Sequence, residues 1–272
     1  MKSKVAIIMS IYKSDKLKNI EAALNSLEMQ TYDNIDIFIA VDGPICSEVK
    51  SYLDCKKNNP KIYISFFDEN KGLATRLNNL ISIIVDEGKH DFVARMDADD
   101  ISLPERISKQ LNFFYSNCDI DVLGSDVIEI SSSDEFIFYK SMASEHTDML
   151  NDIIVKCPFN HPTVMFRAQV FYEGFRYDPA LKNTQDYYLW VDLLVAGKKF
   201  ANLNEPLLKF RIDDDFHNRR GIKKAVNEFK SRVYAFKKMN NLNFKNAFHT
   251  FKLFALRLSP AFVKKIVYSK FR

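Results

Sequence analysis

The chain has 272 residues, of which 47% are hydrophobic and 27% charged, a composition that excludes a disordered chain and predicts one large or two small core-forming domains. Four scattered cysteines without a CxxC pair argue against a zinc site or a disulfide framework. The net charge of +4 is unevenly placed, because residues 229–272 hold 11 Lys and Arg and no acid, which leaves a net charge of −7 on the rest.

The first half of the chain alternates between apolar runs typical of buried strands and segments with a helical period. Short connections between such segments predict right-handed βαβ units, a parallel sheet and an α/β fold. The run at 4–12 lacks a cleavage site and is expected to be a strand rather than a signal peptide, and no long uncharged apolar stretch predicts a membrane-spanning helix. Strands are expected at 4–12, 35–41, 61–67 and 91–96, and helices at 16–30, 46–57, 72–88 and 103–117.

Polar residues follow three of these strands at the point where each one ends. They are Ser10–Tyr12, Asp42–Pro44 and Asp97–Asp100. In open parallel sheets, ligands bind beyond the carboxyl ends of the strands. We therefore expect the three loops to converge on one crevice that holds the chemistry.

The second half is less regular. Strands are expected at 121–131 and 135–142, joined as a hairpin, and residues 157–171 read as a loop with prolines, then a strand and the start of a helix. An amphipathic helix is expected at 183–197, with Gly197 at its C-terminal end.

Three acids, Asp97, Asp99 and Asp100, concentrate negative charge directly after an apolar run. Only the small Ala98 separates Asp97 from Asp99, and in an extended or turning backbone such a pair can point to one side. Two carboxylates so placed suit Mg²⁺ or Mn²⁺, which proteins hold with one or two carboxylates plus substrate phosphates. The alternative is that Asp100 or Ser102 caps the next helix, but a cap needs one acid rather than three, so metal–phosphate binding is favoured.

Seven motifs between residues 4 and 220 resemble, in this order, those of family 2 glycosyltransferases, above all the bacterial enzymes that build O-antigen, capsule and exopolysaccharide repeat units. The resemblance implies the GT-A fold, with a Rossmann-like, mostly parallel central sheet flanked by helices. It also implies a DxD motif that holds a nucleotide-diphospho-sugar through a divalent metal. The motifs are IIMSIYK, SLEMQTY, VDGP, NKGLATRLN, ARMDADDISLPER, NHPTVMFR and QDYYLWVDLL.

The resemblance assigns roles to residues of the donor half. Asp97 and Asp99 would bind the metal, and Asp42 would accept a hydrogen bond from a uracil base. The alternative for Asp42 is a turn acid before Gly43. The implied nucleotide-sugar-binding set is Ser10, Tyr12, Asp42, Arg76, Asp97, Ala98 and Asp99.

Asp186 matches the position of the general base that deprotonates the acceptor hydroxyl in the family. Asp186 would lie in the first turn of a helix, where the helix dipole stabilises a charged carboxylate that can act as a base. The alternative is that Asp186 only stabilises the start of this helix. A base on one side of the sugar and a metal on the leaving group imply in-line displacement with inversion, which gives a β-glycoside from an α-linked donor. Residues expected to contact the acceptor or the diphosphate are His161, Arg211, His217 and Arg219.

The basic C-terminal region carries Phe244, Phe248, Phe251, Ala255 and Leu258 on one helical face. A basic amphipathic helix of this kind can lie on anionic lipid, and the alternative, which the sequence leaves equally open, is a terminal helix packed on the body. No nucleic-acid-binding module is visible.

The sequence thus predicts an inverting, metal-dependent enzyme that moves glucose or galactose from a UDP-sugar to a polyprenyl-diphosphate-linked saccharide. It would act in the cytoplasm as a peripheral protein at the inner face of the cell membrane. The expected divisions are a donor half at 1–125, an acceptor half at 126–220 and a helical region at 221–272. The alternatives are a nucleotidyltransferase, which the glycine-free loop after the first strand disfavours, and a non-catalytic saccharide-binding protein.

Overall fold

A computed structural model describes residues 2–181, 183–212, 222–240 and 244–258. The predicted strands and helices of the first half are all present, each within three residues of its expected bounds. The elements in chain order are β1 (Val5–Tyr12), α1 (Leu17–Glu28), β2 (Ile35–Asp42), α2 (Ser47–Lys56), β3 (Ile62–Phe67), α3 (Leu73–Glu87), β4 (Phe92–Arg95), β5 (Ile101–Ser102), α4 (Arg106–Ser116), β6 (Val122–Ile130), β7 (Phe136–Lys140), α5 (His146–Asp152), the 3₁₀ turn η1 (His161–Thr163), β8 (Met165–Arg167), α6 (Gln169–Tyr172), α7 (Gln185–Val195), β9 (Phe200–Arg211), α8 (Ile222–Met239) and α9 (Phe244–Leu258).

One continuous sheet runs through the described residues in the order β3-β2-β1-β4-β8-β6-β9-β5, with β7 paired to β6. The strands β1 to β4 are parallel, as predicted. Beyond β4 the sheet is mixed, since β8 runs antiparallel to both of its neighbours while β6 and β9 are parallel. The predicted hairpin is the antiparallel pair β6–β7, whose short connection requires that direction.

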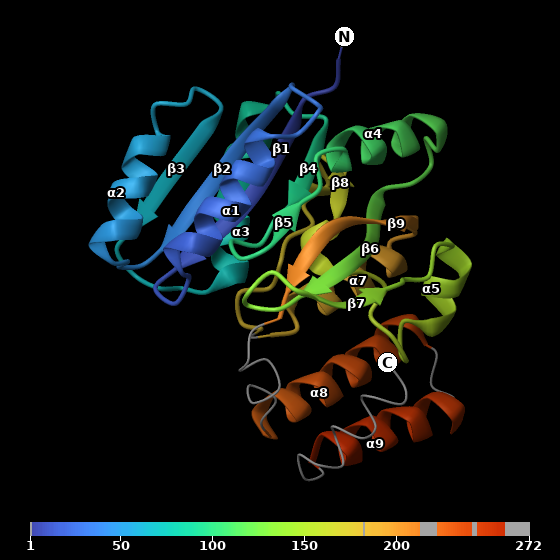
Figure 1. The fold of residues 1–272 in the computed structure, drawn as a ribbon. Coiled ribbons are helices and arrows are strands. Elements are labelled where there is room, and N and C mark those ends of the chain that lie inside the picture. Colours follow the sequence, from blue (N-terminus) through green and yellow to red (C-terminus); the bar gives the residue numbers. More distant parts are fainter. Residues whose placement is uncertain (1, 182, 213–221, 241–243, 259–272) are drawn as a thin grey trace.

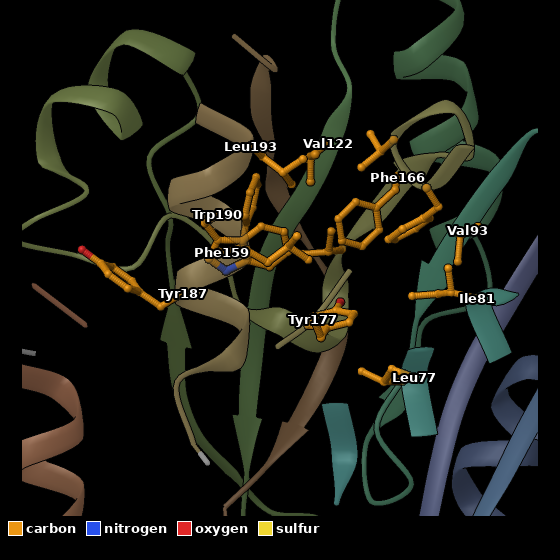
Figure 2. Close-up of a cluster of buried hydrophobic side chains, with 14 of the residues drawn as sticks. Leu77, Ile81, Val93, Val122, Phe159, Phe166, Tyr177, Tyr187, Trp190 and Leu193 are labelled. Carbon is orange, nitrogen blue, oxygen red and sulfur yellow. The ribbon is translucent and has the colours of Figure 1, made fainter. Parts of the chain in front are cut away.

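Helices cover both faces of the sheet. Alternate residues of β1 point to opposite faces, so that Ile7 packs among α1, α2 and α4 whereas Ile8 packs with α3. Figure 2 shows part of the buried cluster to which Ile8 belongs. In it, Trp190 of α7 stacks on Phe166 of β8 at 5.6 Å between ring centroids. Gly197 follows α7 with φ +80°, a left-handed conformation that ends the helix as expected.

The last two helices, α8 and α9, lie side by side on the side of the molecule toward which the arrowheads of β2, β3, β6 and β9 point (Figure 1). The helix α8 packs on α7 through Tyr234, whose ring lies 4.3 Å from Tyr188 and whose hydroxyl donates to Asp192. In α9, the predicted aromatic face points outward instead of packing on the body, since Phe244, Phe248 and Phe251 are 87%, 61% and 65% exposed. None of the described helices is both long enough and apolar enough to cross a membrane.

Candidate active site

The three acids lie in the loop between β4 and β5, at the carboxyl edge of the parallel half of the sheet. Asp97 and Asp99 are half-buried, and Asp100 is almost fully buried. One carboxylate oxygen from each lies within 4.8 Å of the others. The predicted proximity of Asp97 and Asp99 is confirmed, and Asp100 lies with them. Hard oxygen donors that are partly exposed fit Mg²⁺ or Mn²⁺, and Asp97 and Asp99 are the two residues that would hold the ion.

Two fully buried arginines, Arg95 and Arg106, lie next to the acid loop, and the sequence analysis identified neither of them. Arg95, the last residue of β4, forms an ion pair with Asp97. Arg106, in the first turn of α4, donates from Nη2 to the Arg95 carbonyl over 2.7 Å. Burial lowers the pKa of Arg106 to about 9, so it stays charged at neutral pH. An arginine within the apolar run FVARM was the available signal, because an arginine on a buried strand needs an anionic partner.

Arg211, at the end of β9, is far from the three acids in the sequence but binds the loop that carries them. Its Nε donates to the Asp99 carbonyl over 2.8 Å, and its backbone N–H donates to Oδ1 of Asp100 over 2.9 Å. Its guanidinium also forms a 2.6 Å ion pair with Asp134 in the β6–β7 hairpin. In this arrangement Arg211 is buried and positions the acids, and a contact with the diphosphate stays a prediction.

The crowded carboxylates perturb one another. Burial, followed by repulsion from Asp97, raises the pKa of Asp99 to about 6. Burial, then Asp99 and Asp97, raises the pKa of Asp100 well above its usual range. Asp15 belongs to the same group, because burial and then the charges of Asp99 and Asp97 raise its pKa to about 7, against the opposing bond from the Tyr12 N–H. Such repulsion is relieved when a cation binds.

Asp42 and Arg76 were both predicted to contact the donor, and the structure brings them together. The Asp42 carboxylate accepts from Arg76 Nε over 2.6 Å and from the backbone N–H groups of Lys71 and Gly72 at the start of α3. Both side chains are almost fully buried. This pair holds the start of α3 against the end of β2. Ser10 and Tyr12 lie beside it at the end of β1, with Tyr12 38% exposed.

Asp186 lies elsewhere, in the first turn of α7, where it lines a cavity of about 710 Å³. The cavity is bounded by β7, the segment 155–159, α7, α8 and α9. Of the predicted site residues that the structure describes, Asp186 is the one in its wall. The lining residues with charged side chains are Glu129, Lys140, Lys156, Asp186, Glu228 and Arg232, and those with aromatic ones are Phe138, Tyr139, Phe159, Tyr187, Phe229 and Phe254.

His161, in η1, and the buried Tyr177 contact each other. A hydrogen bond of 2.9 Å joins His161 Nε2 and the Tyr177 hydroxyl. Burial raises the pKa of Tyr177, and the charges of both Asp186 and Asp97 act in the same direction, which places this ring within electrostatic range of both sites. Burial and then Arg95 hold the pKa of His161 well below its usual range, so the imidazole is neutral. The other two predicted contacts, His217 and Arg219, lie outside the described residues.

Comparison with known proteins gives a family and close curated relatives. The family described as "Glycosyl transferase family 2" matches residues 6–175. The amylovoran biosynthesis glycosyltransferase AmsE of Erwinia amylovora is 31% identical over 232 residues, which cover 85% of this chain and 84% of AmsE. The UDP-Gal:alpha-D-GlcNAc-diphosphoundecaprenol beta-1,3-galactosyltransferase of Escherichia coli is 28% identical over 272 residues, which cover 98% of this chain and 96% of that enzyme.

Among solved structures, residues 1–349 of S. aureus TarS in complex with UDP share the fold. The TM-score is 0.61 at 17% sequence identity, and the match covers 99% of this chain and 85% of that one. The chain spans 45% of a longer TarS chain. At this level of identity the likeness concerns the fold, and together with the sheet described above it confirms the predicted GT-A architecture.

Proposed function

The chain belongs to glycosyltransferase family 2 and is a glycosyltransferase, and from this premise we propose that it transfers glucose or galactose from a UDP-sugar to a lipid-diphosphate-linked saccharide. The product would be a β-glycoside in a bacterial surface polysaccharide such as O-antigen or capsule. The convergence of Asp97, Asp99 and Asp100 at the carboxyl edge of the parallel strands carries the proposal. The name of the E. coli relative supports a UDP-sugar donor and a diphosphate-linked acceptor.

The donor would bind in the crevice beyond β1, β2 and β4. Asp97 and Asp99 would hold Mg²⁺ or Mn²⁺, which when bound stabilises the negative charge of the departing nucleoside diphosphate. Arg95 and Arg211 keep the two carboxylates in place before any ligand arrives. Ser10, Tyr12, Ala98 and the Asp42–Arg76 pair would line the nucleotide-sugar, in a donor half at 1–125.

The acceptor would bind in the half at 126–220, where Asp186 would take the proton of the attacking hydroxyl on a carboxylate oxygen. The position in the first turn of α7 favours the ionised form that a base requires. Attack from the side opposite the diphosphate inverts the anomeric carbon, which accounts for the β-linkage.

A donor screen tests the proposed reaction. The purified protein with Mn²⁺ is incubated with a panel of UDP-sugars and with synthetic lipid-diphosphate-linked GlcNAc or GalNAc, while UDP release is followed and product linkage is determined by NMR. We expect transfer from UDP-glucose or UDP-galactose, and its loss in EDTA. Absence of both hydrolysis and transfer with every UDP-sugar would contradict the proposal.

The C-terminal helices would bring the enzyme to the inner face of the cell membrane as a peripheral protein. Phe244, Phe248 and Phe251 form an exposed aromatic stripe on α9, and no acid occurs in residues 229–272. Aromatic side chains can enter the acyl boundary of a bilayer while basic residues contact anionic headgroups. The outward direction of this stripe supports membrane contact as the role of α9, while α8 packs on the body.

Replacing both Phe248 and Phe251 with serine is expected to weaken binding to phosphatidylglycerol-rich vesicles at least about a hundredfold. Each phenylalanine removed costs apolar burial worth on the order of 1.5 kcal/mol or more, and every ~1.4 kcal/mol is a factor of about ten in affinity. Vesicle flotation or surface plasmon resonance measures the change. Phe136→Ser is the matched control, because Phe136 is 67% exposed on β7 rather than α9. Equal binding by the double variant and the control would rule out the α9 stripe as the membrane contact.

A further inference from the structure

We propose that α8 and α9 complete the acceptor site, so that the cavity they close against β7, the segment 155–159 and α7 binds the phosphate-linked saccharide that is to be glycosylated. This inference rests on the proposed transfer reaction and extends it to a part of the chain beyond the family match at residues 6–175. The volume of about 710 Å³ falls in the range of small-molecule sites and accommodates a saccharide head.

The helix pair contributes a full wall of this cavity. From α8 come Ala225, Glu228, Phe229, Ser231 and Arg232, and from α9 come Thr250 and Phe254. The ring of Phe229 packs on that of Phe254 at 5.2 Å between centroids, which ties the two helices together at the cavity wall. The site is therefore incomplete without them.

A fixed cation in this wall suits a phosphate group. The Arg232 guanidinium lies 4.2 Å from the centroid of the Tyr187 ring, and its Nη1 donates to the Ile153 carbonyl over 2.7 Å. Held in this way on a ring and a carbonyl, the guanidinium loses little freedom when it binds an anion. Figure 2 shows Tyr187 at the edge of the buried cluster that contains Trp190, with its hydroxyl directed away from the other labelled side chains. Lys140 and Lys156 also line the cavity and add positive charge to it.

The remaining lining suits a sugar. A hexose presents C–H groups on one face and hydroxyls around its edge, and the cavity offers aromatic rings together with the carboxylates of Glu129, Asp186 and Glu228. Specific pockets combine such an apolar lining with a few polar groups. Because Asp186 is in the wall, a hydroxyl of a bound saccharide lies within reach of the proposed base.

The two faces of α9 connect the cavity to the membrane. Thr250 and Phe254 face the cavity, whereas Phe244, Phe248 and Phe251 face outward. The lipid of a lipid-linked acceptor would remain in the bilayer. Its phosphate and sugar would enter the cavity on one side of α9, while the other side of α9 contacts the membrane. This arrangement favours a lipid-linked acceptor over a free sugar.

Two cavity variants, Arg232→Gln and Phe229→Ala, test the inference, and Phe136→Ala is the aromatic control outside the cavity. The probe is farnesyl-diphosphate-linked α-GlcNAc, used below its micelle concentration with no membrane present. We expect the KM for this acceptor to rise about tenfold or more in each cavity variant, because a charge-assisted bond or an aromatic contact is lost. The KM for the UDP-sugar should stay within about twofold of wild type.

Trp190, the single tryptophan of the chain, gives a readout that does not depend on turnover. Its ring lies 5.0 Å from that of Phe159, which lines the cavity. Titrating the probe should change tryptophan emission in the wild type and the control, and do so only at about tenfold higher concentration in the cavity variants.

The outcomes separate the two proposals. An unchanged acceptor KM in both cavity variants, with transfer intact, would overturn the acceptor-site inference and leave the proposed function standing. If the wild type neither hydrolyses nor transfers, the proposed function fails, and the tryptophan titration alone then decides whether the cavity binds the probe. Equal titration curves for wild type and both cavity variants would overturn the inference in that case too.

Discussion

Replacing Asp99 with asparagine is expected to lower the rate of transfer at least about 10³-fold and to abolish the metal dependence of UDP binding. Asp99 is one of two half-buried carboxylates that can hold the cation at the carboxyl edge of β4, and asparagine removes the charge at nearly constant shape. Steady-state transfer assays and calorimetric titration of UDP with and without Mn²⁺ measure the two effects.

The same substitution should not cost stability, which separates a loss of function from a loss of fold. The pKa of Asp99 is raised from 3.8 to about 6 by burial and by Asp97, so between these pH values the folded protein binds more protons than the unfolded chain. Its stability therefore falls as pH rises through this window, and above it the ionised Asp99 remains destabilising. In EDTA at pH 7.5, the Tm of Asp99→Asn should equal or exceed that of the wild type.

Asp54→Asn provides a matched control, because Asp54 is a partly exposed acid on α2 that pairs with Lys57. It should retain wild-type transfer and UDP binding. Wild-type transfer by Asp99→Asn in the presence of Mn²⁺ would show that the acid cluster does not hold the metal.

Replacing Asp186 with asparagine is expected to lower kcat for transfer by about 10²–10⁴-fold while UDP binding in Mn²⁺ stays unchanged. Asp186 lines the cavity bounded by α8 and α9, whereas the acids that would hold the metal lie in the loop after β4. The loss should therefore fall on the step that removes the acceptor proton. Transfer kinetics with both substrates varied, together with calorimetry for UDP, measure it.

Asp192 lies on the same helix and accepts a hydrogen bond from the Tyr234 hydroxyl. Because the side-chain oxygen of asparagine can accept the same bond, Asp192→Asn is the appropriate control. It should transfer at near the wild-type rate. A parallel loss of UDP affinity in Asp186→Asn would instead place Asp186 in the donor site.

The parallel half of the fold could be predicted because each strand is a short apolar run and each helix has a clear apolar period. The longest strand, β9, was missed. It contains Asn202, Asn204 and Pro206, and its pairing with β6 shifts register twice near Ser125–Val127, so no alternation marks it. The two-residue strand β5 is too short to leave a pattern, and its existence depends on β9.

In the site, too, contacts between residues close in the sequence could be predicted, whereas contacts between distant residues could not. Asp97 and Asp99 are two positions apart, so their proximity follows from the chain itself. The support given by Arg106 and Arg211 depends on elements that meet only in the folded protein. Arg106 was therefore missed, and Arg211 was predicted as a contact of the acceptor or the diphosphate rather than as a support for the acids. Asp42 and Arg76 were predicted separately as contacts of the donor, and their mutual pairing was not foreseen.

The bonds from Arg211 to the acid loop have a consequence for the order in which the molecule folds. They join residues 111 and 112 positions apart, and loop closure over such a span comes late and slowly. During synthesis the acids leave the ribosome long before β9 does, with Arg95 next to them in the chain but without Arg211, whose bonds restrain the loop. The proposed donor site would thus acquire its geometry only when β9 joins the same sheet. A nascent chain would not bind nucleotide-sugar until the whole catalytic unit had folded.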